Sequence, residues 1–327
     1  MKSKYFFINS IIFTFFGSVL VFLLLWLALW KFPLESYMDG EYAWWMQQKD
    51  YIEKNSDERE IIFLGDSRMK AAIIPEEIAP NVYNLAIGGG TAIEMYYALK
   101  TYLKNHPAPE KIFLGFGACH YTQNECFENR TLYFHYLSPK EEKEAQEVKF
   151  NDGAPLSQRE KANLLSLIRR YDIRFPNLYA SAVFHSFFRR TKLNRQNYSD
   201  VAFSKGQMFF GKSEKSSALN GEAKEKSFEP LYSIRFYLDK IILLCRENNI
   251  PLYIIQLPMN EASFNAVQTS GYAEQFAAFM RGIEKKYAIF VETQIPCYPS
   301  EFFGDPSHLN SSGAHRFSAE IKEKYCL

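Results

Sequence analysis

Residues 60–68 read Glu-Ile-Ile-Phe-Leu-Gly-Asp-Ser-Arg. The apolar run at 61–64 is typical of a short strand buried on both faces, and the glycine and polar residues after it mark its end. Ser67 then stands between the carboxyl end of this strand and a following helix, where open α/β sheets bind ligands. Taken alone, Gly-Asp-Ser is also typical of an ordinary helix N-cap.

The same alternation continues along the chain. Further apolar runs of strand length follow at residues 111–117, 251–258 and 288–291. Segments with one apolar helical face lie at residues 91–103, 232–247 and 273–286. Buried strands that alternate with amphipathic helices predict an α/β domain, with a parallel sheet covered by helices on both faces.

The alternation is interrupted at residues 138–229, within a domain that we place at 59–327. This stretch carries charge clusters and a Ser/Lys/Gly/Glu-rich segment, and it contains one clear helical pattern, at 158–171. Long segments without secondary structure are functional or disordered. We therefore interpret 138–229 as an irregular insertion.

An uncharged apolar run at residues 5–30 precedes the domain. As a helix, its roughly 26 residues extend about 39 Å, against a hydrocarbon layer of about 30 Å. A cleaved signal peptide and a buried core helix remain alternatives. A run of this length without a small-x-small cleavage site favours an uncleaved transmembrane anchor.

Charge around the run predicts its orientation. Lys2 and Lys4 lie in a tail at residues 1–4, whereas acidic residues follow in a juxtamembrane segment at residues 31–58. The positive-inside rule therefore predicts an N-terminus inside the cell and an extracytoplasmic domain. Trp26, Trp30, Trp44 and Trp45 are expected at the outer membrane interface.

Overall charge and cysteine spacing argue against a nucleic-acid-binding protein and against a cysteine-bound metal site. Lys and Arg number 38 against 37 Asp and Glu, which gives no phosphate-binding footprint, so no nucleic-acid partner is expected. The five cysteines show no metal-ligand spacing, so neither a metal nor a cofactor is expected. Cys119 and Cys126 are either a small disulfide loop or free thiols.

A second stretch with candidate chemistry lies near the C-terminus. Residues 303–313 read Phe-Gly-Asp-Pro-Ser-His-Leu-Asn-Ser-Ser-Gly. The spacing of Asp305 and His308 lets the carboxylate fold back on the imidazole Nδ1, which leaves Nε2 free to face a nucleophile. Asn310 is expected to cap the last helix.

Together, Gly65-Asp66-Ser67 and Asp305-Pro-Ser-His308-Leu-Asn310 resemble motifs of the SGNH/GDSL hydrolase superfamily. Residues 83–91 look like its second block. The resemblance implies a three-layer α/β/α fold and a catalytic triad of Ser67, Asp305 and His308. It also implies an oxyanion hole formed by the backbone N–H groups of Ser67 and Gly89. The α/β-hydrolase family is excluded because Met69 stands where its motif needs glycine.

In the third block of this family, the present sequence departs from the family pattern. The family has Gly-x-Asn there, whereas residues 115–120 read Gly-Phe-Gly-Ala-Cys-His. A backbone N–H at Gly117 or Ala118, or the His120 side chain, is a candidate substitute for the missing oxyanion donor. Arg68 is expected to be exposed, either holding an anionic polymer or without a role.

An anchor, an SGNH-like domain and an insertion are together similar to membrane-anchored proteins that modify cell-envelope polymers. Examples are alginate O-acetyltransferase-type proteins and the D-alanyl-transfer protein of teichoic acid operons. The resemblance implies an extracytoplasmic O-acyltransferase, a glycopolymer substrate and a membrane-bound O-acyltransferase partner. The alternatives are a carbohydrate or lipid esterase of the same fold, and a non-catalytic assembly subunit or glycan-binding module.

Overall fold

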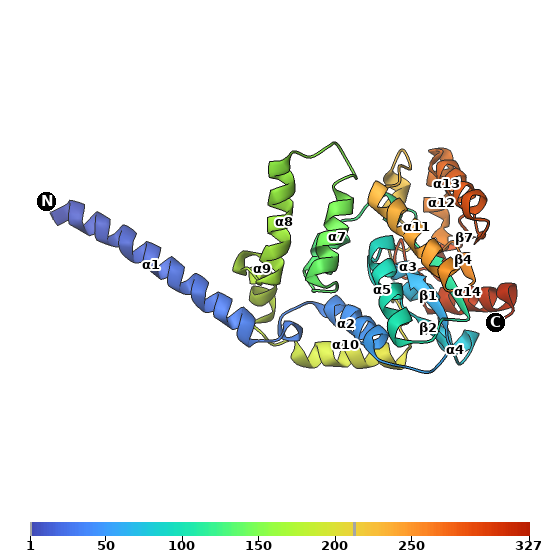
Figure 1. The fold of residues 1–327 in the computed structure, drawn as a ribbon, viewed down its shortest axis with the longest axis horizontal. Helices are drawn as coiled ribbons and strands as arrows, with labels where there is room; N and C mark the ends of the chain where they lie inside the picture. The colour runs from blue at the N-terminus through green and yellow to red at the C-terminus, as the bar shows by residue number, and fades with distance from the viewer. Residues whose placement is uncertain (1, 212–213) are drawn as a thin grey trace.

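A computed structural model describes residues 2–211 and 214–327, with side chains from residue 7 onward, and consists of a long helix followed by an α/β domain (Figure 1). Helix α1 (Lys2–Lys31) contains the apolar segment Phe7–Lys31, whose mean hydropathy is 2.6. This segment is long and apolar enough to span a membrane, and its most apolar window is not buried against the protein.

The chain continues from α1 through the 3-10 turn η1 (Leu34–Ser36) into helix α2 (Gly40–Glu53). The expectation that Trp44 and Trp45 lie at the membrane interface is wrong. Both are buried in the domain, where Trp45 packs edge-on against Phe134. Aromatic residues close to a membrane helix look the same in the sequence whether they pack in a protein core or lie at the membrane interface.

The main sheet has five parallel strands in the order β2-β1-β3-β4-β6. They are β1 (Ile61–Gly65), β2 (Val82–Asn84), β3 (Lys111–Gly115), β4 (Leu252–Ile254) and β6 (Phe290–Val291). A separate parallel pair joins β5 (Met259–Asn260) and β7 (Cys297–Tyr298). The predicted parallel α/β architecture is confirmed, and strand β2, which ends in the polar Asn84, was not predicted.

Alternate residues of β1 face two core clusters. Ile62 and Leu64 belong to the cluster that contains residues of α5 (Ala92–Asn105), α11 (Tyr232–Glu247) and α13 (Tyr272–Tyr287). Ile61 and Phe63 belong to the cluster on the other face, with α3 (Ser67–Ala72), α4 (Pro75–Ile78) and α14 (Ser311–Tyr325). Helices therefore cover both faces of the sheet, which explains the continuous apolar strands.

The stretch 138–229 is mainly helical, so the expectation of an irregular insertion is wrong. It contains α7 (Pro139–Lys149), α8 (Gln158–Asp172), α9 (Pro176–Ser186) and α10 (Thr191–Phe203). Of these, only α8 was predicted. Capping boxes start both α7 and α8, with Ser138 and Ser157 as the capping residues. The cap at Ser138 was the local signal for α7, which carries too few apolar residues for a clear periodic pattern.

The segment from α8 to α9 packs against the C-terminal half of α1 (Figure 1). Trp26 Nε1 donates a hydrogen bond to the carbonyl of Ile173 at 2.9 Å, and Arg174 Nη1 donates to the carbonyl of Leu29 at 2.8 Å. The rings of Phe22 and Phe175 meet edge to face. The insertion thus links the apolar helix to the domain.

The strand order indicates where a ligand crevice is expected along the sheet. The chain runs from β1 outward to β2 and then returns to add β3 on the other side of β1. The order therefore reverses at β1, and the loops after β1 and β3 diverge there. Ser67 and residues 116–120 follow these two strand ends.

Candidate active site

The structure brings Ser67, His308 and Asp305 together from opposite ends of the chain. His308 Nε2 lies 2.7 Å from Ser67 Oγ, across a sequence separation of 241 residues. His308 Nδ1 lies 2.8 Å from Asp305 Oδ2 and 3.0 Å from Oδ1. With Nδ1 protonated and facing the carboxylate, Nε2 can accept the serine proton, which is the arrangement of a Ser-His-Asp triad.

A tight hairpin presents Asp305 and His308. Phe303 and Leu309 form an antiparallel bridge, and the Gly304 N–H donates to the His308 carbonyl at 2.8 Å. The backbone N–H of His308 also donates to Asp305 Oδ1 at 2.9 Å. Burial raises the pKa of Asp305, but the hydrogen bond and charge of His308 outweigh this and hold it below its usual range. The carboxylate is therefore ionised and fixed in place.

Asp66 fixes the nucleophile's turn. Its Oδ1 caps α3 by accepting from the N–H of Arg68 at 2.8 Å, so Ser67 occupies the first helical position. Its Oδ2 accepts from the N–H of Gly117 at 2.7 Å and lies 3.2 Å from His120 Nε2. Asp66 is fully buried and joins the loops after β1 and β3. The sequence indicated an N-cap in Gly-Asp-Ser, and the structure assigns it to Asp66, but the contact of Asp66 with the loop after β3 was not predicted.

The hydrogen bond from the Gly117 N–H to Asp66 affects two of the predicted substitutes for the missing oxyanion donor, Gly117 and His120. Because the N–H of Gly117 already donates to Asp66, it is engaged within the protein. The side chain of His120 is about one-fifth exposed and reaches the same carboxylate. His120 Nε2 is therefore also engaged by Asp66, but unlike Gly117 it belongs to a partly exposed side chain.

Arg68 differs from the exposed side chain that was expected. It is buried and pairs with Glu222, a fully buried residue of η3 (Glu222–Lys224) in the insertion. Burial lowers the pKa of Arg68, but the Glu222 carboxylate outweighs this and raises it above its usual value. Glu222 Oε1 also accepts from the N–H of Cys119 at 3.0 Å. The insertion thus holds both site loops, and no sequence signal indicated this.

Gly89, the predicted second oxyanion donor, has a backbone conformation that favours glycine. Its φ is +75°, in the left-handed region, and an added Cβ would collide with Cys126 Sγ. Within residues 2–211 and 214–327, the backbone N–H groups of Ser67 and Gly89 donate no internal hydrogen bond. Both are therefore available to an external acceptor.

Phe210, a residue of the insertion, stacks on the imidazole of His308. Its ring centroid lies 4.0 Å from that of His308, at an interplanar angle of 8°. An added Cβ on Gly304 would collide with the backbone carbonyls of residues 210 and 211, so the two segments are in close contact. This ring restricts how His308 can rotate. The pair Phe209-Phe210 carried no periodic signal that separates it from ordinary packing.

All five cysteines are free in the structure, so the disulfide alternative for Cys119 and Cys126 does not form there. Burial, and then the charge of Glu94, raise the pKa of Cys126 to about 11. At neutral pH this thiol is therefore protonated. It acts as a packing partner of Gly89.

Comparison with known proteins adds little beyond this geometry. A family model of unknown function matches residues 211–326, which include Asp305 and His308 but not Ser67. No curated protein matches the chain. The partial match does not establish a family.

Proposed function

We propose that the domain has an SGNH-like three-layer fold and acts as an extracytoplasmic, serine-dependent O-acyltransferase on a cell-envelope glycopolymer. The observation that carries the proposal is the continuous contact from Asp305 through His308 to Ser67 Oγ. Supporting it are the parallel sheet with its order reversed at β1, and the two backbone donors at Ser67 and Gly89.

Covalent acyl transfer follows from this geometry. His308 Nε2 removes the proton of Ser67 as Oγ attacks the carbonyl carbon of a donor ester. His308 returns this proton to the leaving alcohol, and the acyl group stays on Ser67 as an ester. His308 then deprotonates a sugar hydroxyl, which attacks the acyl carbon, and the proton passes to Ser67 as the acylated sugar leaves. Asp305 holds the tautomer and stabilises the imidazolium.

The oxyanion of each tetrahedral intermediate is assigned to the N–H groups of Ser67 and Gly89. Both are rigid, because Asp66 caps the first turn of α3 and Cys126 packs against Gly89. Fixed donors at the site of developing charge are worth about 10²–10³ in rate each. His120 is the candidate for a third donor, from its position beside Asp66.

The anchor supports a substrate at the membrane surface. Helix α2 continues from α1, and its Glu41 pairs with Lys70, three residues after Ser67 in α3. The apolar helix is thus connected, through η1, α2 and this ion pair, to α3, which carries the proposed nucleophile. We place the N-terminus inside and the domain outside, with a membrane-bound O-acyltransferase as the partner that delivers acyl groups; orientation and partner follow from the charge pattern and the resemblance.

The proposal is tested with the full chain in detergent and an aryl acetate. We expect a burst of aryl alcohol and an acetyl adduct on the peptide containing Ser67, found by mass spectrometry. Ser67→Ala should abolish both, whereas Ser181→Ala, at an exposed serine of α9, should change neither. Equal turnover in wild type and Ser67→Ala, without an adduct, would refute acyl-enzyme chemistry.

An esterase is the second candidate, and one observation favours it. The side chains of His308 and Asp305 are 17 % and 34 % exposed, so water has access to the triad. Adding oligosaccharide acceptors to the acetylated enzyme separates the two functions. Acylated sugar indicates a transferase, and acetate release alone indicates an esterase.

A further inference from the structure

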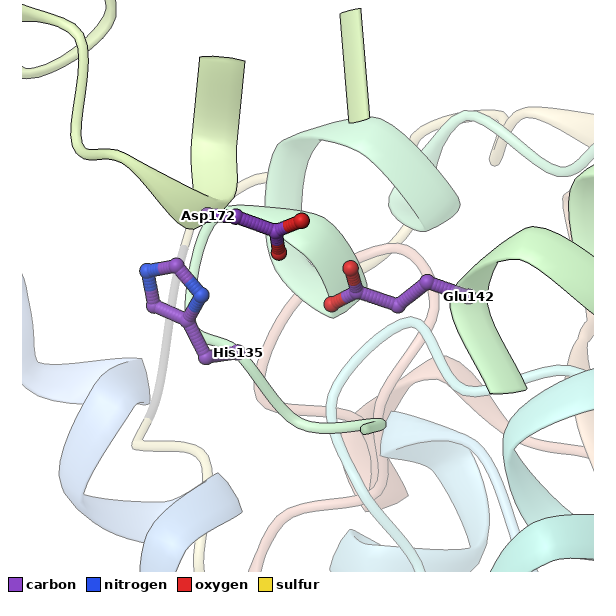
Figure 2. A group of neighbouring side chains, drawn as sticks. All are labelled: His135, Glu142 and Asp172. Atoms are coloured by element: carbon purple, nitrogen blue, oxygen red, sulfur yellow. The ribbon is translucent and has the colours of Figure 1, made fainter. Parts of the chain in front are cut away.

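A second group of chemically reactive side chains lies outside the triad, where the insertion meets the domain. His135 follows η2 (Phe127–Leu132), Glu142 lies on α7, and Asp172 is the last residue of α8. One ligand atom from each lies within 4.8 Å of the others. Figure 2 shows the imidazole and both carboxylates pointing toward a common centre.

Glu142 provides the independent observation. It is 1 % exposed, and neither of its carboxylate oxygens accepts a hydrogen bond from a lysine, arginine or backbone N–H group in residues 2–211 and 214–327. Neither Glu142 nor Asp172 forms an ion pair with any cationic side chain in the described part of the chain. Buried carboxylates are almost always paired, hydrogen-bonded or bound to a metal, because desolvating an unpaired charge costs several kcal/mol.

His135 is oriented as a ligand would be. Its Nε2 lies 3.1 Å from Tyr179 Oη, and Figure 2 shows the other ring nitrogen directed toward the carboxylates. A hydrogen bond at one ring nitrogen fixes the tautomer and leaves the other free to coordinate, as in most protein sites with metal-bound histidine.

Nearby cations are already engaged elsewhere. Lys49 Nζ donates to the His135 carbonyl at 2.9 Å, and Arg174 Nη1 donates to the Leu29 carbonyl. Within the described residues, neither cation therefore forms a direct ion pair with the two carboxylates. A divalent ion would balance them.

We propose that His135, Glu142 and Asp172 bind one divalent transition-metal ion of the Zn²⁺ or Mn²⁺ class. One imidazole nitrogen and two carboxylates suit such ions better than Mg²⁺ or Ca²⁺, which prefer all-oxygen sites. Ligands about 2.1 Å from a metal lie roughly 3.4–4.2 Å from one another, so the present spacing closes with a small side-chain adjustment.

The ion serves as a clamp and takes no part in acyl transfer. It joins the loop after η2 to the ends of two insertion helices. Asp172 directly precedes Ile173 and Arg174, whose hydrogen bonds attach the insertion to α1. Metal binding therefore stabilises the junction between the apolar helix and the domain, and this inference stands independently of the proposed function.

The test measures metal content and thermal unfolding of the full chain in detergent. After chelation, wild type should rebind one equivalent of Zn²⁺, and this binding should raise its Tm. His135→Gln, Glu142→Gln and Asp172→Asn should each lose both the bound equivalent and the rise in Tm. Glu144→Gln, at a partly exposed position on the same helix, is the matched control. Background binding at exposed His and Cys residues is unchanged in all variants.

Co²⁺ gives a direct readout on wild type that does not depend on the folding of the variants. We expect a visible d–d absorption spectrum that saturates at one equivalent and is displaced by Zn²⁺. If wild type and His135→Gln bind equal amounts of metal, the proposal is overturned. It is also overturned if Glu142→Gln raises the Tm of the chelated protein while wild type takes up no Co²⁺, because the two carboxyls then share a proton instead.

Discussion

Substituting Glu222 with Gln removes the counter-charge of a buried guanidinium while preserving shape. The Arg68 and Glu222 side chains are 7 % and 0 % exposed, so water cannot solvate the guanidinium once the carboxylate charge is lost. Breaking such a pair costs about 3–5 kcal/mol. Oε1 of Gln can still accept from the N–H of Cys119, so the loss comes from the charge. A domain of this size then loses roughly 6–20 °C in Tm, at about 2–4 °C per kcal/mol.

Activity should fall as well, because Arg68 adjoins the nucleophile. A displacement of about 1 Å at the reacting group can cost on the order of 10²-fold in rate. We therefore expect kcat/KM of Glu222→Gln on an aryl acetate to drop about 10- to 100-fold, measured well below the lowered Tm.

Two further variants separate this mechanism from general damage. Glu274 pairs with Arg281 at the surface, and Glu274→Gln should cost less than about 1 kcal/mol. Replacing both Arg68 and Glu222 with Met should restore much of the stability, because no unpaired charge remains. Urea unfolding of the full chain measures all three. If Glu222→Gln loses no more stability than Glu274→Gln, the pair does not hold the insertion on the site.

Three other predictions concern groups around the triad. Phe210→Leu should lower kcat several-fold by loosening His308, whereas Phe209→Leu, at an exposed neighbour, should leave it unchanged; equal kinetics would contradict a positioning role. Gly89→Ala should lower both Tm and kcat. Adding Cys126→Ala should recover only part of the lost Tm and kcat, because it relieves the collision with the new Cβ but leaves φ at +75°. Finally, burial raises the pKa of Cys126 to about 11, against roughly 8.5 in an unfolded chain, so its alkylation in the folded protein should accelerate about tenfold per pH unit between pH 8 and 10. A rate that levels off near pH 8.5 in peptide mapping would show that burial does not raise this pKa.

Local patterns in the sequence determined the main elements of the fold. The apolar run at residues 61–64 predicted β1, and the apolar face at 232–247 matched α11 to the residue. Burial on both faces of a parallel strand leaves a continuous apolar run, and burial on one face of a helix leaves a 3.6-residue period. Ser67, Asp305 and His308 could be named because they stand in two short motifs, whose spacing and family resemblance are visible in the sequence alone.

Tertiary structure alone decided how the site is held. Arg68 meets Glu222 across 154 residues, and Phe210 covers His308 from a segment that the sequence predicted to be irregular. A buried ion pair or a stacked ring leaves no periodic signature, because each partner reads as an ordinary surface charge or core aromatic until the chain brings them together. The sequence by itself therefore named the candidate residues of the site, whereas packing between distant segments determined which residues position them.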